Sequence, residues 1–370
     1  MTGTLARFAP TEVFNSFWYF ASERQRMYLR RVEQCPAPWS CDEILNTYRF
    51  TNVYRASDRV SQYLLTHVIY DGARRRAVDD VLRILLFKLF NRVGTWQLLT
   101  DALGDITADS FNERDAAAVL DDGIARGRKV YSAAYIIPPV PGTEGRKHRG
   151  HLRLLREQLT TGGLERLLQA QSLQGLVADL RTWPGLGPFL AYQLAIDLNY
   201  GPHLQFDEDD FVLAGPGARD GLSKCFSDAR TVSPESLIRT VAETQHESFA
   251  SRGLEFGGLW GRPMKLIDVQ NVFCEISKYA RAAHPDVAGV AGRTRIKQRF
   301  APAGPLPLPA FPPHWRVAIP RIPQTEQRVD AWGQERLWDT PHDLVAGTPP
   351  GVTVRARSTT ASHVRGVSKA

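Results

Sequence analysis

The sequence predicts a mostly α-helical protein, and three observations support that fold class. Apolar residues recur at spacings of three and four over residues 78–89 and again over residues 267–279, as on the buried face of a helix. Between residues 11 and 300 the period-two alternation of a half-buried strand is rare. The composition, 43% hydrophobic and 23% charged over 370 residues, is that of a globular chain with a large core.

The chain shows no targeting or metal-binding signal. No apolar run approaches the roughly 20 residues needed to cross a bilayer, and Asn15 and Ser16 interrupt the N-terminal apolar residues. We therefore expect no membrane partner and a cytoplasmic, nucleoid-associated location, or a nuclear one in a eukaryote. No C-x-x-C pair is formed by the four cysteines, which are Cys35, Cys41, Cys225 and Cys274. No zinc or iron–sulfur site is therefore predicted.

The charge balance favours a polyanionic partner. The chain has 46 Lys and Arg against 39 Asp and Glu, a formal net charge of +7, which is compatible with nucleic acid. The alternative of a basic protein that binds no nucleic acid stays open. Residues 74–76 are three consecutive arginines, which form either a solvated face or a tether for DNA phosphates.

The expected elements divide the chain into four parts. Residues 1–137 form an N-terminal helical domain, in which Asp42 caps a helix. The aromatic residues at 14–20 belong to its core or, in the alternative, stack on bases. Residues 138–150, rich in Pro, Gly and basic residues, form an exposed basic loop. Residues 151–299 form a second helical part. Eight prolines between 302 and 323 predict that residues 300–370 form a Pro-rich, extended arm and a disordered tail.

The most informative segment lies at residues 173–196. An amphipathic helix over about 173–180 is followed by a Trp-Pro-Gly-Leu-Gly-Pro turn and a second helix, which together predict a helix-hairpin-helix. Glycines let the backbone approach a phosphodiester, and the N–H groups at the next helix N-terminus point at phosphate oxygens. We therefore expect double-stranded DNA to contact the residues of this turn, which are Trp183, Gly185, Gly187 and Phe189.

An aspartate past the turn extends the pattern. In helix-hairpin-helix DNA glycosylases a catalytic aspartate lies a fixed distance beyond the turn, and Asp207 occupies the matching position. The chain thus resembles the helix-hairpin-helix DNA glycosylase superfamily, which implies a glycosylase-like helical fold. Bifunctional members carry a lysine on the second hairpin helix, whereas Pro188, Phe189 and Leu190 follow Gly187 here. No lyase activity is expected.

Three further blocks narrow the resemblance. Residues 36–59, 209–218 and 268–281 resemble the helical domain found with 5-hydroxymethyldeoxyuridine DNA kinases, within a group of DNA base hypermodification proteins related to alpha-glutamyl/putrescinyl thymine pyrophosphorylases. The resemblance covers roughly residues 12–285. It implies an enzyme that flips a 5-hydroxymethyluracil-type base and acts on its 5-substituent. The chain lacks the G-x-x-x-x-G-K-[ST] motif, so a kinase, if needed, would be a separate protein.

The acidic residues after the hairpin are the expected catalytic groups. The resemblance assigns the first role to Asp207, as a general base or as a stabiliser of positive charge, and the neighbouring Asp209 and Asp210 complete the candidate set. The alternative is that these aspartates cap a helix that begins near Phe211. The clustered carboxylates of Glu208, Asp209 and Asp210 could also raise one another's pKa by like-charge repulsion or chelate a divalent cation, although the sequence contains no defined metal-binding motif.

Two polar sets are candidates for substrate binding. The first is expected to lie within about two helical turns and consists of Asn52, Tyr54, Arg55 and Asp58. The second is expected on one helix and consists of Gln270, Asn271, Glu275 and Lys278. The competing interpretations are a surface pair of Arg55 with Asp58 and a salt bridge between Glu275 and Lys278.

The sequence leaves three functions open. The first is base hypermodification, the second is a monofunctional DNA glycosylase that excises a modified base, and the third is a non-catalytic reader of modified DNA that uses the Pro-rich arm for partners.

Overall fold

The computed structural model describes residues 8–133, 137–143, 145–229, 231–301, 304 and 306–321. These residues are mostly α-helical, which confirms the predicted fold class. Within these ranges no strand forms, and the only pairings of that type are isolated bridges such as Tyr48 with Arg299. None of the described helices is long and apolar enough to span a bilayer. The predicted disordered tail lies, from residue 322 on, outside the described residues.

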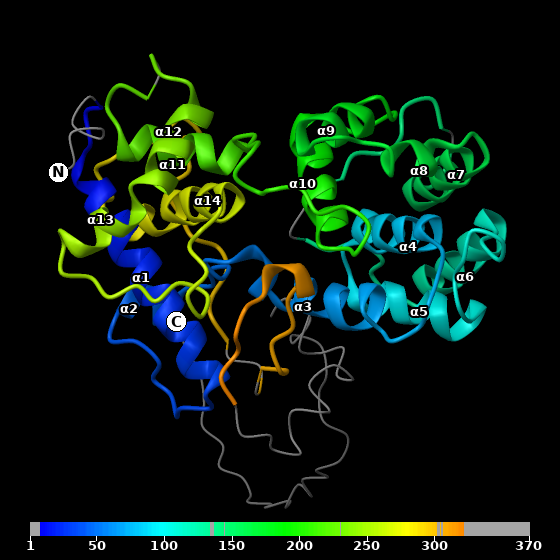
Figure 1. Ribbon diagram of the computed structural model, residues 1–370, viewed down its shortest axis with the longest axis horizontal. Coiled ribbons are helices and arrows are strands. Elements are labelled where there is room, and N and C mark those ends of the chain that lie inside the picture. The colour runs from blue at the N-terminus through cyan, green and yellow to red at the C-terminus, as the bar shows by residue number, and fades with distance from the viewer. Residues whose placement is uncertain are drawn as a thin grey trace, which may run out of the picture. The chain divides into compact units, whose positions relative to one another are not determined.

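One group of helices joins the beginning of the chain to its later part (Figure 1). It consists of α1 (Glu12–Val32), α2 (Glu43–Thr47), α11 (Pro216–Cys225), α12 (Pro234–Glu243), α13 (Gln245–Ala250) and α14 (Leu266–Ala283). Thr11 caps α1 and Asp42 caps α2 through side-chain oxygens, as expected for Asp42. The side chains of Phe14, Phe17 and Trp18 on α1 are buried, which confirms that they are core. The expectation is wrong for Tyr19 of the same cluster, which is 40% exposed.

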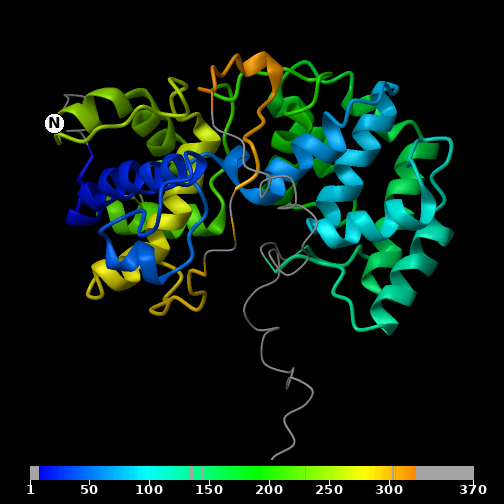
Figure 2. The same ribbon diagram turned by 90° about the horizontal axis from the view of Figure 1, so that it is seen from below.

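A second group holds the middle of the chain, and Figure 2 shows it beside the first. It consists of α3 (Arg59–Tyr63), the π-helix η3 (Leu64–Ile69), α4 (Ala77–Phe90), α5 (Val93–Leu103), α6 (Glu113–Ala125), α7 (Lys147–Thr160), α8 (Gly163–Leu167), α9 (Leu173–Arg181) and α10 (Pro188–Asn199). Helix α4 is buried along most of its length and packs against α5, α7, α8 and α10. It forms the centre of this group.

Helices α11 and α14 cross at a glycine. A Cβ atom at Gly221 would overlap the carbonyl oxygen of Phe273, so no side chain can separate the two helices there. Because α11 follows the loop after α10, this crossing fixes that loop relative to α14.

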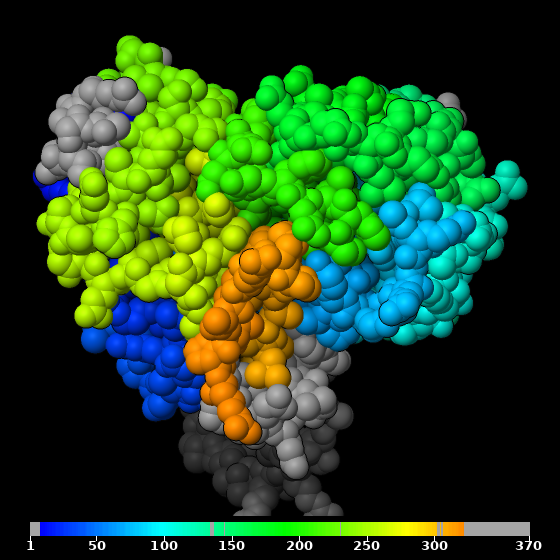
Figure 3. Space-filling model, viewed as in Figure 1, coloured from blue at the N-terminus to red at the C-terminus, as the bar shows by residue number. Residues whose placement is uncertain are grey.

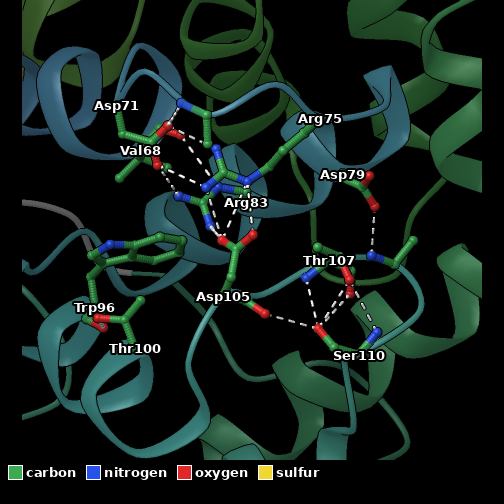
Figure 4. A network of polar contacts seen from close by, with 12 residues as sticks. Val68, Asp71, Arg75, Asp79, Arg83, Trp96, Thr100, Asp105, Thr107 and Ser110 are labelled. Atoms are coloured by element: carbon green, nitrogen blue, oxygen red, sulfur yellow. Dashed lines mark hydrogen bonds and ion pairs between the residues drawn. The ribbon is translucent and has the colours of Figure 1, made fainter.

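Within the arginine run at residues 74–76, the central Arg75 is held by carboxylates (Figure 4). Arg75 bonds Asp71 at 2.8 Å and Asp105 at 2.9 Å, and Arg83 bonds the same two aspartates at 2.9 and 2.7 Å. The side chain of Arg75 is only 7% exposed, so the expectation of a solvated face or a phosphate tether is wrong for this residue. Its charge is neutralised within the protein.

After α14 the chain continues as an arm, which we define as residues 287–321. The amide of Gln62 holds it by two hydrogen bonds to Ala310, one donated to the carbonyl oxygen and one accepted from the N–H, both 2.8 Å. A short 3₁₀ turn, η4 (Pro313–Trp315), follows. Figure 3 shows this part of the arm, in orange, lying in the groove where the two helix groups meet.

The predicted limits 1–137, 138–150, 151–299 and 300–370 stay predictions, since packing does not test whether the parts fold independently. The packing does show that α1 and α2 belong with helices after residue 215. It also shows that α7 begins at Lys147 and buries His148, so the segment 138–150 includes the first turn of a helix.

Candidate active site beside the acidic loop

The candidate catalytic residues lie on the loop between α10 and α11, residues 204–215, which we call the acidic loop. The Nζ atom of Lys265 bonds Asp207 Oδ1 at 3.2 Å and also contacts the carboxylate of Asp209. Asp207 also accepts the backbone N–H of Asp209 at 3.0 Å. That hydrogen bond, followed by Lys265, lowers the pKa of Asp207. Asp207 is therefore an exposed, ionised carboxylate at neutral pH.

The acidic loop is held by a cation from α12. Arg239 donates to the backbone carbonyls of Asp209 at 2.6 Å and Asp210 at 3.0 Å. The next helix, α11, begins only at Pro216, with Gly215 as its N-cap. The alternative that these aspartates cap a helix is therefore wrong. Asp210 is exposed on the same loop.

Glu208 is the one acid of this run to which the sequence analysis assigned no catalytic role. Its side chain is 3% exposed and pairs with Arg262, while its Oε1 atom is buried without a hydrogen-bond partner. Burial raises the pKa of Glu208 to about 8, against the opposing effect of Arg262. Four consecutive acids look alike in a sequence, and only the loop backbone shows which one points inward.

Arg262 connects Glu208 to other elements. The ring of Trp315, on the arm, lies 3.9 Å from its guanidinium carbon. The hydroxyl of Tyr54, a predicted substrate-binding residue, donates to the carbonyl oxygen of Arg262 at 2.7 Å. The structure thus brings Tyr54 close to the acidic loop.

The described residues contain no group of three or more His, Cys, Asp or Glu side chains placed to hold a metal ion. Of the carboxylates expected to be able to chelate a divalent cation, Glu208 pairs with Arg262, and Asp209 shares the ammonium group of Lys265 with Asp207. Their mutual repulsion is reduced by this cation.

The two predicted substrate sets lie against each other. The side chain of Asn271 donates to the carbonyl oxygen of Asn52 at 2.7 Å, and Glu275 accepts the N–H of Thr51 at 3.0 Å. Asn271, Glu275 and Lys278 share one face of α14, as expected, and the predicted salt bridge between Lys278 and Glu275 is present at 2.7 Å. Whether this face also binds a substrate stays a prediction.

The segment 52–58 is not the α-helix that was expected. Only a 3₁₀ turn, η2 (Arg55–Ser57), forms. Asn52 donates from its side chain to the carbonyl oxygen of Ser57, and Asp58 accepts the N–H of Asn52 at 2.9 Å. Such side chain–backbone bonds compete with a helix.

Arg55 does not form the expected surface pair with Asp58. It is buried and bonds both carboxylate oxygens of Asp197 on α10, at 2.6 and 2.7 Å. Its Nε also donates to Gln193 at 3.0 Å, while Lys88 lies 3.3 Å from Asp197. This bidentate pair joins the 52–58 segment to α10. The remaining candidate, Gln270, is buried and accepts the N–H of Gly215 at 3.3 Å.

The two helices of the predicted hairpin are present as α9 and α10. Between them Gly185 has φ +83°, a conformation that favours glycine, and packs near the backbone of residues 139–140. Gly187 is exposed at the N-cap of α10, whereas Trp183 is buried and Phe189 packs against Gly215. Of the four predicted DNA contacts, the geometry leaves Gly187 the most accessible. DNA binding by this turn stays a prediction.

Comparison with known proteins is consistent with the resemblance seen in the sequence. Residues 11–289 match the family described as 5-hmdU DNA kinase, helical domain. A 5-hmdU DNA kinase of Bacillus phage SP10 is 26% identical over 295 residues, which cover 72% of this chain and 45% of that protein. The chain thus spans less than half of the length of this relative, and no solved structure matches it significantly. Because the family match covers most of the 370 residues, the chain belongs to the 5-hmdU DNA kinase helical-domain family.

Proposed function

We propose that the chain binds duplex DNA that contains a 5-hydroxymethyluracil-type base, extrudes this base and acts on its 5-substituent. The family assignment and the printed name of the phage relative support the substrate class. Residues 1–370 contain no G-x-x-x-x-G-K-[ST] motif, so the proposal assigns a phosphorylation step to a DNA base kinase outside them. Extrusion is part of the proposal because chemistry on a base inside the duplex stack is otherwise blocked.

The observation that carries the proposal is the pair of unlike carboxylates on the acidic loop. Asp207 is exposed and has a lowered pKa, whereas Glu208 is buried and has a raised pKa. Adjacent acids whose environments separate their pKa values are suited to acid and base roles at one pH. Asp207 is the proposed base, and Glu208 is the proposed group that holds a proton at neutral pH.

The proposed reaction is a displacement at the 5-methylene carbon. A phosphorylated 5-hydroxymethyl group loses its phosphate as the C–O bond breaks, and the nitrogen of an amine or amino acid forms the new C–N bond. The proton released from that nitrogen passes to Asp207. A base near the attacking nitrogen accelerates such a step because it removes the proton as positive charge develops.

A monofunctional glycosylase is the second candidate, because the same exposed, ionised Asp207 could stabilise positive charge on the sugar as a modified base leaves. A non-catalytic reader of modified DNA is the third. The three candidates differ in their products: a heavier nucleoside, a free base, or bound but unchanged DNA.

The test is mass spectrometry of nucleosides from DNA that carries 5-hydroxymethyluracil or its phosphorylated form, incubated with the chain and a mixture of amines and amino acids. We expect a heavier nucleoside that disappears with Asp207→Asn. Asp101→Asn, an exposed carboxylate on α5, is the matched control and should keep the product. A released base would establish the glycosylase, and unchanged DNA that is bound equally by both variants would overturn the catalytic proposal.

A further inference from the structure

The arm contains an unusual distribution of charge. No Asp or Glu occurs between residues 287 and 325, although this stretch carries six Lys and Arg. Four of these cations alternate with other residues and form what we call the basic strip: Arg293, Arg295, Lys297 and Arg299. A stretch of this length without an acid cannot neutralise its own cations.

The geometry places the four cations on one side of the segment. Residues 292–298 form no helix or turn, and all four members of the basic strip are exposed. Between them, Ile296 and Phe300 are partly buried and pack against the hydrophobic core. Since alternate side chains of an extended segment point to opposite sides, the core holds one side and the cations occupy the other.

The segment is anchored by its backbone. The carbonyl oxygen of Gln298 accepts the N–H of Arg49 at 3.0 Å, and the N–H of Phe300 bonds the carbonyl oxygen of Thr47 at 2.9 Å. At the other end, the N–H of Ala291 bonds Asp220 Oδ1 at 2.7 Å. These bonds fix the path of the strip before any ligand arrives, which reduces the ordering cost of binding.

The cations of the strip are not neutralised within the protein. Across the described ranges, none of the four side chains forms an ion pair with a carboxylate, and Arg299 only faces the ring of Tyr48 at 5.9 Å. Asp220, which anchors the segment, is already bonded to Ala291 and to the hydroxyl of Ser277. The positive charge of the strip therefore remains directed at solvent.

We propose that the basic strip binds consecutive phosphates of a duplex DNA backbone. The inference rests on the proposed function in one respect, namely that the partner is DNA, and it adds the surface that supplies the affinity. Phosphate contacts of this kind position DNA without reading its sequence. The arm leads from the strip to Trp315, which lies over Arg262 beside the acidic loop.

The test measures binding of a short unmodified duplex by fluorescence anisotropy at several salt concentrations. The logarithm of the binding constant falls with the logarithm of salt concentration, with a slope of about 0.9 for each neutralised phosphate. Replacing all four cations by glutamine should reduce this slope by about 3.6. Arg293→Gln with Arg295→Gln should reduce it by about 1.8, and replacing the three arginines by lysine should leave it nearly unchanged.

Arg114→Gln with Arg126→Gln is the matched control, because these α6 side chains are 91% and 73% exposed but lie near Glu113 and Asp122. The control should retain the full slope. An unchanged slope in the glutamine variants, or no binding by the unaltered chain at any salt concentration, overturns the proposal. Because the duplex is unmodified, a reduced slope supports DNA binding by the strip even when no modified nucleoside forms. An unchanged slope together with formation of the modified nucleoside would refute the strip and leave the proposed function standing.

Discussion

Two sets of cations in this protein have opposite surroundings. Arg75 and Arg83 each bond Asp71 and Asp105 in the network of Figure 4. The basic strip, by contrast, lies on a stretch without acids and is exposed to solvent. Arg75 belongs to the arginine run at residues 74–76, so both sets include part of a basic cluster in the sequence. The carboxylates within reach, and not the cations themselves, therefore decide whether a basic cluster stabilises the fold or is available to a ligand.

Arg55 is the most deeply buried example of a cation paired with a carboxylate, and its replacement should have the largest effect on stability. Arg55→Met would leave Asp197, whose side chain is 0% exposed, with Lys88 as its one charged partner among the residues that the structure describes. We expect a loss of about 3–5 kcal/mol in the free energy of unfolding, measured by urea titration. Adding Asp197→Leu should recover most of this loss. A loss near zero in the single variant would mean that burial of the pair is not structurally required.

Glu208 pairs with Arg262 through one carboxylate oxygen while the other has no hydrogen-bond partner. Its contribution to stability should therefore depend on pH. Its pKa, raised to about 8 in the folded chain, means that the folded state keeps a proton that the unfolded state releases above its ordinary pKa. Stability therefore falls as pH rises from about 5 to 8. Glu208→Gln removes this dependence, so the variant should gain on the order of 3 kcal/mol relative to the unaltered chain over that range.

Urea titrations at both ends of this pH range provide the measurement for Glu208. Burial also raises the pKa values of Asp58 and Asp268, to about 6. Both residues are present in the unaltered chain and in the Glu208→Gln variant, so their contributions cancel in the difference between the two free energies of unfolding. A difference that does not change with pH would show that Arg262 keeps Glu208 ionised throughout.

Replacing Arg83 tests the network that Arg75 and Arg83 form with Asp71 and Asp105. Its side chain is 3% exposed, but its partner Asp105 is 54% exposed and can regain water. Arg83→Met should therefore cost less than the change at Arg55, about 2 kcal/mol, by thermal unfolding. A cost as large as that at Arg55 would contradict the role assigned here to solvent exposure of the partner.

Replacing the cations of the basic strip, which form no ion pair within the described residues, should have the smallest effect on stability. Replacing the basic strip by glutamine should change the free energy of unfolding by less than about 0.5 kcal/mol, because no internal ion pair is lost. Thermal unfolding in parallel with the DNA titrations checks this. A large destabilisation would mean that the strip is part of the fold, and the comparison with Arg75 and Arg83 would fail.

The local sequence pattern was sufficient to predict where several helices form, but not how the segments between them fold. The periodicity at 78–89 and 267–279 and the cap at Asp42 predicted α4, α14 and α2, because these signals act within a few residues. The segment 52–58 was misjudged as helical because its polar side chains bond the local backbone.

Ion-pair partners and burial depend on the tertiary fold. Arg55 lies 142 residues from Asp197, and nothing near either residue indicates the other. The sequence likewise located the acidic loop but could not separate Asp207 from Glu208, because their different exposure is set by Arg262 and by the packing around the loop. The resemblance to a family supplied the position of Asp207, whereas the environment of Glu208 required the structure.

The glycine crossing of α11 and α14 has a dynamic consequence. At the crossing, Gly221 leaves the two backbones in direct contact, without side chains that could rearrange between them, so a displacement of one helix at this point would displace the other. Helix α11 starts at the acidic loop and α14 ends shortly before the basic strip. Occupancy of either end would then be felt at the other as a coupling free energy, and by linkage the effect would be reciprocal.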